Sequence, residues 1–302
     1  MLGVGGAGES GGRSREVGGR RWGESGGGRM GDRKWGGREA RRSEESGSPE
    51  GGDRLPIDLR PMGMKLPNLP TKRQIAYEWR NNGPVITKAL IAVCVAVWLV
   101  EVVLRLLSPT LFAAFVGSGM VMPYTIFTRP WAWFTALFLH APNIMHVLFN
   151  MIALYSVGPE LERLMGHWKY LVLYLISGFG GAVGLVVWAR VTGEWGMAAY
   201  GASGALFGLF AAILVVYRRV GADITSMMVW MGINILLPFL VGGIAWQAHV
   251  GGFIAGGVLT WLLVAGVPAL RGRSFNQRMW IYGGVVIAVL VAIAWVCLLS
   301  VM

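Results

Sequence analysis

The positions of hydrophobic and polar residues divide the chain into a polar N-terminal segment and a series of long apolar runs. A helix needs roughly 20 apolar residues to cross a bilayer core of about 30 Å. Six or seven segments after residue 80 meet this requirement, at approximately 86–107, 133–157, 168–190, 202–218, 225–245, 247–268 and 279–301. The pattern predicts an all-α, polytopic membrane protein.

Two of these segments are irregular. The second contains polar residues, among them His140 and Asn143, so only its later part is expected to be a regular helix. The fourth is short for a complete crossing, so its first residue is expected to begin below the membrane surface.

The N-terminal segment differs sharply in composition. Residues 1–80 hold 16 Lys and Arg and 11 Asp and Glu, a net charge of +5, with Gly, Ser and Pro filling much of the remainder. Such a segment buries too little apolar surface to offset its ordering entropy, so it is interpreted as a disordered cytoplasmic tail and linker. Its Arg and Gly content also fits RNA binding, but the interleaved acidic residues favour a solvated tail without a nucleic-acid partner. A translation start at Met62 or Met64 would remove most of it.

Basic residues in the short loops set the expected orientation, because cytoplasmic loops carry an excess of lysine and arginine. Four basic groups fall on one side if the N-terminus is cytoplasmic: the segment before the first span, and the loops after spans two, four and six. The opposite loops carry only Arg105, Arg129 and Arg190. Seven spans then place the C-terminus outside, and the starts of spans two, four and six near the outer leaflet.

Four polar residues lie near those three starts: His140, His146, Ser203 and His249. Polar groups inside a membrane are costly to bury and usually face the bundle interior. Each has an ordinary structural explanation, since Ser203 can be a small packing residue and His249 an interfacial histidine. Taken together with the neighbouring glycines, however, they favour a shared site.

The glycines form two faces of small residues. Gly204 and Gly208 are four residues apart in the fourth span, and Gly252 and Gly256 are four apart in the sixth. Such faces let helix backbones approach more closely than the usual distance of about 8–10 Å. Packing of the two faces is therefore expected to bring Ser203 within about 3 Å of His249, as a Ser–His nucleophile pair requires.

Acyl transfer also needs hydrogen-bond donors for a developing oxyanion. Ser203 lies at an expected helix start, where backbone N–H groups are free and the positive end of the helix dipole lies. His146 and Asn150 are four residues apart, so they project from the same helix face and can add side-chain donors. Asn150 has few structural reasons to stand in an apolar run.

Two other chemistries compete for these residues. A zinc protease would need a His-Glu-x-x-His motif, which is absent, and His140 and His146 lie six residues apart. A proton-coupled transporter would need a buried carboxylate relay, whereas Glu101 and Glu194 fall near span ends. Neither alternative is favoured, and no metal or other cofactor is expected.

Four motifs give the chain a resemblance to the rhomboid intramembrane serine proteases over approximately residues 84–270. "GASG" (201–204) resembles the family's Gly-x-Ser-Gly nucleophile motif, and "AHVGG" (248–252) its Ala-His-x-x-Gly helix. "HVLFN" (146–150) is similar to the His-x-x-x-Asn motif, and "GPELERLMG" (158–166) to the loop that carries a structural glutamate, here Glu162.

The resemblance implies a role for each matching position. Ser203 would be the nucleophile and His249 its general base, without an aspartate. His146, Asn150 and the Ser203 backbone amide would stabilise the oxyanion, and His140 would match the first histidine of that segment. The supporting positions implied are Phe207, packed on the imidazole, and Gly201, Gly204, Gly252 and Glu162.

The resemblance also implies an architecture: six core helices over 81–270, a water-filled cavity open to the outside, and a loop at about 108–131 lying partly in the outer leaflet. Residues 271–302 add a cytoplasmic loop and a seventh span. Two positions depart from the family's pattern. Its Trp-Arg pair reads Trp131-Ala132 here, and six residues rather than five separate His140 from His146, with Pro142 in the turn between them.

The implied function is that of a serine endopeptidase that cleaves peptide bonds in or near transmembrane helices. Its partners would be single-pass or polytopic membrane proteins and the lipid bilayer, and its expected location is a bacterial cell membrane. The alternative is a catalytically inactive rhomboid-like protein that binds or escorts membrane clients.

Overall fold

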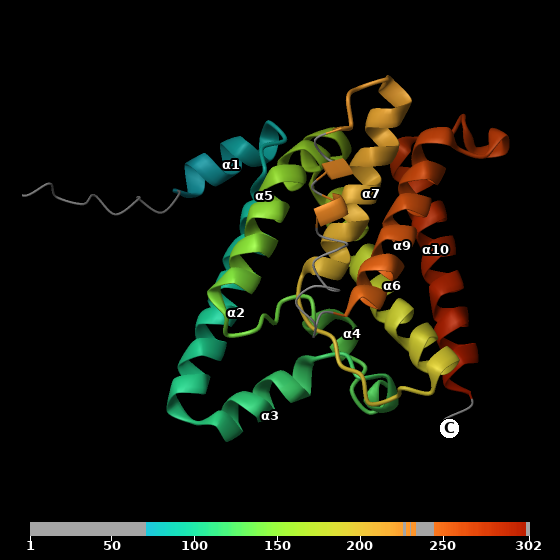
Figure 1. The fold of residues 1–302 in the computed structure, drawn as a ribbon. Coiled ribbons are helices and arrows are strands. Elements are labelled where there is room, and N and C mark those ends of the chain that lie inside the picture. Colours follow the sequence, from blue (N-terminus) through green and yellow to red (C-terminus); the bar gives the residue numbers. More distant parts are fainter. Residues whose placement is uncertain (1–70, 226–227, 230, 234–244, 300–302) are drawn as a thin grey trace, which may run out of the picture. The chain divides into compact units, whose positions relative to one another are not determined.

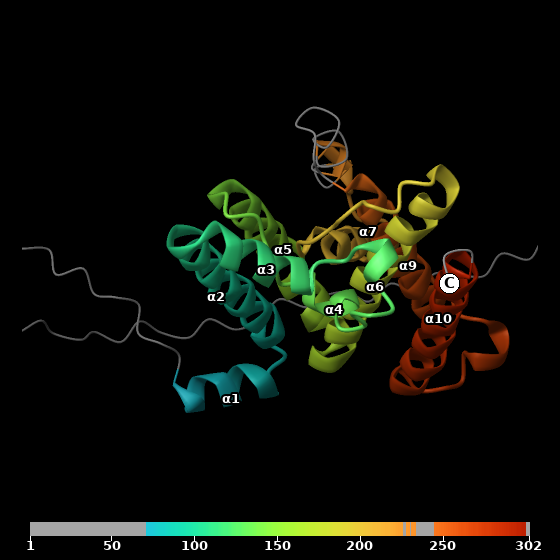
Figure 2. The same ribbon diagram turned by 90° about the horizontal axis from the view of Figure 1, so that it is seen from below.

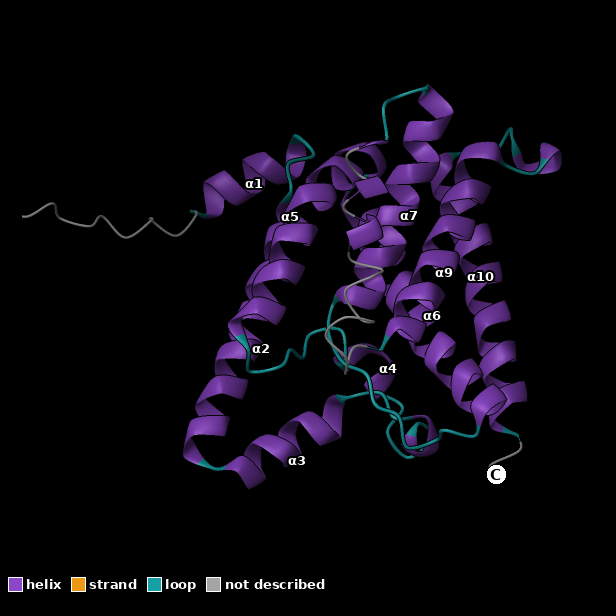
Figure 3. Cartoon of the chain, in the orientation of Figure 1, coloured by secondary structure: helices purple, strands orange, loops and turns teal. Residues whose placement is uncertain are grey.

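The structure, a computed structural model, describes residues 71–225, 228–229, 231–233 and 245–299. Nearly all of these residues are helical, and within these ranges no strand forms (Figures 1 and 3). Within the described ranges, six helices have the length and apolar composition to cross a membrane: α2 (Val85–Leu107), α5 (Ile144–Met165), α6 (His167–Thr192), α7 (Ser203–Val220), α9 (Trp246–Ala265) and α10 (Phe275–Leu298). The chain is therefore a multi-pass membrane protein, as predicted.

Among the elements whose bounds lie within the described residues, five shorter ones connect or flank these helices. Three are α-helices, α1 (Lys72–Arg80), α3 (Pro109–Gly119) and α4 (Ala132–Thr135), and two are single 3₁₀ turns, η1 (Pro123–Thr125) and η2 (Pro268–Leu270). Residues 72–80, assigned above to the tail and linker, thus form a helix, which begins with a capping box at Thr71. Residues 1–70 of the predicted disordered tail lie outside the described residues.

The second span differs from the prediction of 133–157. Its helix α5 begins at Ile144 and continues to Met165, while Ala132–Thr135 form the separate α4. Asn143 caps α5 by accepting a hydrogen bond from the Met145 N–H at 2.9 Å, and Pro142 lacks the N–H that a longer helix would need. Of the predicted span 225–245, most residues lie outside the described ranges.

Helices α6, α7 and α9 form the centre of the bundle, with α2 and α10 on opposite sides (Figures 1 and 2). Glycines allow the central helices to touch through their backbones. A Cβ atom at Gly252 of α9 would collide with the Gly204 carbonyl of α7, and one at Gly256 would lie 2.5 Å from the Gly208 oxygen. On the other side of α9, a Cβ at Gly184 of α6 would lie 2.6 Å from the Gln247 oxygen.

Glu162, near the end of α5, anchors the start of α2. Its buried carboxylate accepts hydrogen bonds from the N–H groups of Ile86 and Thr87 and from the Thr87 hydroxyl, each at 2.8 Å. His167 Nδ1 lies 2.5 Å from the same carboxylate, and its Nε2 lies 2.8 Å from the Trp79 carbonyl oxygen of α1. These bonds satisfy free N–H groups at the start of α2 and link four helices, α1, α2, α5 and α6.

The predicted outer-leaflet loop contains α3, which runs across the end of the bundle at an angle to α2 (Figure 1). An isolated antiparallel bridge between Val121 and Ala199, with N···O distances of 3.0 and 2.9 Å, ties this loop to the segment that precedes Ser203. Where the family pattern has an arginine, Ala132 is buried. The nearby Arg129 guanidinium instead donates to the Gly117 carbonyl at the end of α3.

Candidate active site

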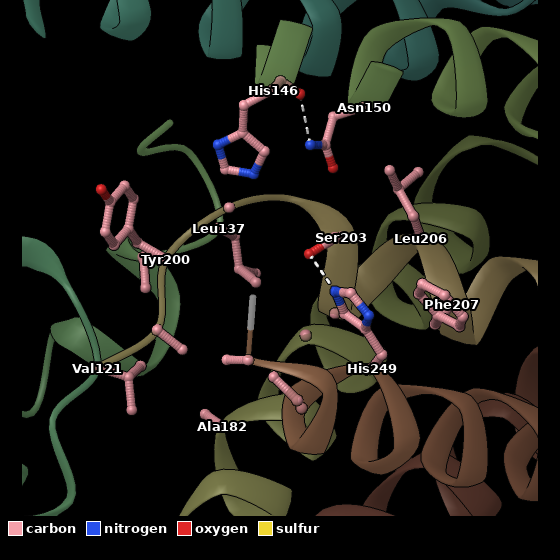
Figure 4. Close-up of a pocket in the computed structure, with 18 of the residues that line it drawn as sticks. Val121, Leu137, His146, Asn150, Ala182, Tyr200, Ser203, Leu206, Phe207 and His249 are labelled. Carbon is pink, nitrogen blue, oxygen red and sulfur yellow. Dashed lines mark hydrogen bonds between the residues drawn. The ribbon is translucent and has the colours of Figure 1, made fainter. Parts of the chain in front are cut away.

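Ser203 and His249 meet although 46 residues separate them. Ser203 is the first residue of α7, and His249 lies in the first turn of α9. The Ser203 Oγ is 2.9 Å from His249 Nε2 (Figure 4). If Nε2 accepts the hydroxyl proton, the serine is poised to become a nucleophile and the histidine to act as its general base.

The close glycine packing explains how so short a side chain reaches another helix. Gly204 directly follows Ser203, and Gly252 lies one turn after His249. Because a Cβ at Gly252 would collide with the Gly204 carbonyl, the two backbones are in contact beside the Ser–His pair. This backbone contact brings the short serine side chain within hydrogen-bonding distance of the histidine.

Phe207 orients the His249 imidazole. Their rings are parallel within 9°, with centroids 4.3 Å apart. Within the described part of the chain, the buried Nδ1 of His249 has no hydrogen-bond partner, so no carboxylate completes a triad. Ring stacking thus supplies the orientation that an aspartate supplies in Ser-His-Asp sites.

His146 points toward the loop that enters α7. Its Nδ1 accepts a hydrogen bond from the Ala141 backbone N–H at 3.0 Å. Because a backbone N–H can only donate, this contact leaves the proton of a neutral ring on Nε2. A Cβ at Gly201 would lie 3.1 Å from that Nε2, and Gly201 has φ +128°, a backbone conformation that favours glycine. The His146 Nε2–H is therefore directed toward the approach to Ser203.

Asn150 lies one helical turn after His146 on the same face of α5. One hydrogen of its side-chain amide is donated to the His146 carbonyl oxygen at 2.7 Å (Figure 4). Since the amide nitrogen carries two hydrogens, the second remains available to a ligand. The start of α7, where backbone N–H groups are free, lines the same cavity as these donors.

The residues enclose a cavity of about 500 Å³ inside the bundle. Ser203, His249, His146, Asn150 and Phe207 all line it. Small residues supply much of the remaining wall: Ala136, Gly178, Ala182, Ala199 and Ala248. The serine hydroxyl and the histidine imidazole thus share one hollow among the membrane-spanning helices.

Three residues proposed from the sequence do not line this cavity: His140, Glu162 and Gly252, the last of which is buried where α9 contacts α7. His140 is fully buried behind His146, with ring centroids 5.3 Å apart. Burial, reinforced by neighbouring His146, lowers the pKa of His140 to about 4, so its ring is neutral near pH 7. Glu162 lies near the other end of α5, where it holds α2 as described above.

Sequence analysis overlooked Glu101, which it placed near a span end. Its carboxylate is fully buried, and its two oxygens lie 3.2 and 3.0 Å from the His140 backbone nitrogen. A lone acidic residue in an apolar run was the available signal, because such residues are expensive to bury in a membrane. Its partner, a backbone N–H 39 residues away, leaves no pattern in the sequence.

Comparisons with known proteins agree with this architecture. The Rhomboid domain matches residues 127–266. The chain is 34% identical over 157 residues to the rhomboid protease GluP of Bacillus subtilis, covering 49% of the chain and 28% of that relative. It is 35% identical over 158 residues to RHOMBOID-like protein 1 of Arabidopsis thaliana, covering 49% of the chain and 37% of that relative.

A shorter relative is covered more fully. The chain is 33% identical over 139 residues to the rhomboid protein YdcA of Bacillus subtilis, a match that covers 44% of the chain and 67% of that relative. The fold and the site define a polytopic membrane protein with a Ser–His pair inside its helix bundle. The chain belongs to the rhomboid family. It spans well under two thirds of the length of the first two relatives.

Proposed function

We propose that this protein is an intramembrane serine endopeptidase that uses Ser203 and His249 as a catalytic dyad. The observation that carries the proposal is the distance of 2.9 Å between Ser203 Oγ and His249 Nε2, in a cavity among membrane-spanning helices. Relatives named as rhomboid proteases support the same reaction class.

The proposed reaction begins when His249 Nε2 takes the Ser203 hydroxyl proton. Oγ then attacks the carbonyl carbon of the scissile peptide bond and forms a tetrahedral intermediate. His249 returns the proton to the departing amine, which leaves an acyl-enzyme on Ser203. A water molecule, deprotonated by His249, then hydrolyses the ester and releases the second product.

The negative charge on the intermediate needs several donors. The Ser203 backbone N–H, the His146 Nε2–H and the free hydrogen of the Asn150 amide are the proposed set. In other hydrolases, removal of one oxyanion donor raises the barrier of the reaction by roughly 3–4 kcal/mol. The tautomer of His146 that the Ala141 N–H favours is the one that can donate.

The proposed substrates are single-pass or polytopic membrane proteins. The amides of a transmembrane helix are hydrogen-bonded, so the scissile segment must unwind before Ser203 can attack it. Gly near the cleavage site would promote unwinding most, because it has the weakest helix propensity after Pro.

We infer a cell-membrane location with a cytoplasmic N-terminus. The end of the bundle where α7 ends and α10 begins carries several basic residues, Arg218, Arg219, Arg271, Arg273 and Arg278, which favours that end as the cytoplasmic one. The cavity around Ser203 then opens toward the opposite side, and α10 ends there.

The test uses the full-length protein in proteoliposomes with a single-span reporter substrate. Parent protein is expected to release two fragments, and Ser203→Ala and His249→Ala are expected to release none above background. The matched control is Ser156→Ala, which removes an exposed hydroxyl of α5 that bonds only to its own helix. Cleavage by Ser203→Ala at the parent rate would refute the proposal, and substrate binding without cleavage by the parent would favour a non-catalytic rhomboid-like binder.

A further inference from the structure

Two side chains of α2 hold the segment that connects α4 to α5. Glu101 accepts a hydrogen bond from the His140 backbone N–H, with its oxygens at 3.2 and 3.0 Å. Trp98 donates its indole Nε1–H to the Ala141 carbonyl oxygen at 3.2 Å. Because Trp98 and Glu101 are three residues apart, they project from the same face of the helix. They thus hydrogen-bond two consecutive residues of the segment, Glu101 through the His140 N–H and Trp98 through the Ala141 carbonyl oxygen.

The same segment positions His146. The Ala141 N–H, which lies between the His140 N–H and the Ala141 carbonyl along the backbone, donates to His146 Nδ1 at 3.0 Å. This bond fixes both the ring position and the tautomer with hydrogen on Nε2. The contacts thus run without a gap from α2, through residues 140 and 141, to a side chain that lines the cavity.

Glu101 is placed to bond the His140 backbone and not to contact a substrate. Its side chain is fully buried in an apolar helix and does not line the cavity, so it cannot touch a substrate there. Burying a carboxyl group is costly unless it forms specific hydrogen bonds.

We propose that Glu101 and Trp98 are positioning residues that set the rate of peptide hydrolysis by holding His146 in place as an oxyanion donor. This inference rests on the proposed function. It assigns to α2, which contributes no residue to the cavity lining, a role in catalysis through the backbone of residues 140 and 141.

The first test is a double-mutant cycle in proteoliposomes with the single-span reporter. Glu101→Leu removes the acceptor but keeps a similar volume, and kcat is expected to fall by up to about 100-fold while KM stays within about twofold. Glu101→Gln keeps an acceptor oxygen and is expected to retain most of the parent kcat. In a His146→Ala background, Glu101→Leu is expected to lower kcat no further, because the donor that it positions is already absent.

Two further variants separate positioning from stability. Leu90→Ala, three turns earlier on the same buried face of α2, destabilises the helix without touching residues 140 or 141 and is expected to leave the kcat of the folded fraction unchanged. Trp98→Phe removes the indole N–H but keeps an aromatic ring, and it is expected to lower kcat through His146. This variant tests the proposal if Glu101→Leu does not fold. Equal, additive losses in the parent and His146→Ala backgrounds would overturn the proposal, as would a Glu101→Gln variant as slow as Glu101→Leu.

The second test does not require activity. The chain contains only four histidines, so ¹⁵N-labelled imidazoles can be assigned with single substitutions. In the parent, His146 is expected to show an unprotonated Nδ1 and a protonated Nε2, and Glu101→Leu is expected to give a mixture of tautomers. An unchanged His146 tautomer would overturn the proposal even if the protein cleaves substrate. A shifted tautomer in a protein that cleaves nothing would support the positioning contacts while refuting the proposed function.

Discussion

The contact between the glycine faces of α7 and α9 gives a sharp prediction for Gly252→Ala. A Cβ at residue 252 would collide with the Gly204 carbonyl oxygen and lie 2.8 Å from its carbon and 3.1 Å from the Ser177 oxygen. All three atoms belong to backbone, so no side chain can rotate away. The two helices must therefore move apart to admit one methyl group.

The size of that movement follows from the contact distances. Ordinary van der Waals contact begins at 3.4 Å, and the added Cβ would lie 2.8 Å from the Gly204 carbonyl carbon. Relieving this contact alone requires the helices to separate by about 0.6 Å, and relieving the contact with the Gly204 oxygen requires more. Moving His249 away from Ser203 by that amount takes their separation of 2.9 Å beyond the range of about 2.6–3.2 Å that proton transfer needs. Loss of general-base catalysis is expected to lower kcat by about 100-fold or more.

Stability should change much less than activity. Overpacking costs about 1–3 kcal/mol, and the better helix propensity of alanine offsets about 1 kcal/mol of this. The matched control is Gly284→Ala, because a Cβ at this exposed position of α10 meets nothing within 4 Å. Gly284→Ala is expected to keep the parent kcat, and its free energy of unfolding is expected to rise by about 1 kcal/mol. Reporter cleavage in proteoliposomes and thermal unfolding in detergent measure the two effects, and a Gly252→Ala variant with the parent kcat would refute the reasoning.

Three further predictions concern Phe207, His140 and Glu162. Phe207→Leu keeps volume but loses the ring stacked on His249, so kcat is expected to fall by up to about tenfold, and an unchanged kcat would count against orientation by stacking. Because burial lowers the pKa of His140 from 6.5 to about 4, the folded state binds fewer protons than the unfolded state between these values. Stability is therefore fully present above pH 6.5 and falls by about 3 kcal/mol as the pH drops toward 4, and melting curves of His140→Asn should show a smaller fall. Glu162→Ala leaves the buried N–H and hydroxyl of Thr87 without their acceptor and is expected to cost about 3 kcal/mol or more; an unchanged melting temperature would contradict this.

The sequence predicted those features that depend on composition or on fixed spacing. Apolar runs of the required length identified the six spanning helices of the described residues, while the predicted span 225–245 lies mostly outside them. Small residues four apart beside Ser203 and His249 predicted the close approach of α7 and α9, because glycine faces have a direct geometric consequence. The boundaries of α5 were harder, since the pattern of hydrophobic residues runs on through Phe138 while the capping Asn143 and Pro142 decide where the helix begins.

Contacts made by the backbone could not be predicted in this way. The bond from the His140 N–H to Glu101 depends on the path of an irregular segment, and any residue type at position 140 other than proline could donate it. The same holds for the Ala141 N–H that fixes the tautomer of His146. The sequence therefore predicted that Ser203, His249, His146 and Asn150 lie together, but not the backbone groups that hold His146 in place.

The most direct measurement of the central claim is the site of labelling by a serine-directed fluorophosphonate. Parent protein in liposomes, Ser203→Ala and His249→Ala are treated in parallel, and the modified peptide is identified by mass spectrometry. The account predicts a single modified residue, Ser203, in the parent and no labelling of either variant, because the hydroxyl 2.9 Å from His249 is activated only by that histidine. Labelling of Ser203 at the parent rate in His249→Ala, or labelling of the parent at another serine alone, would contradict it.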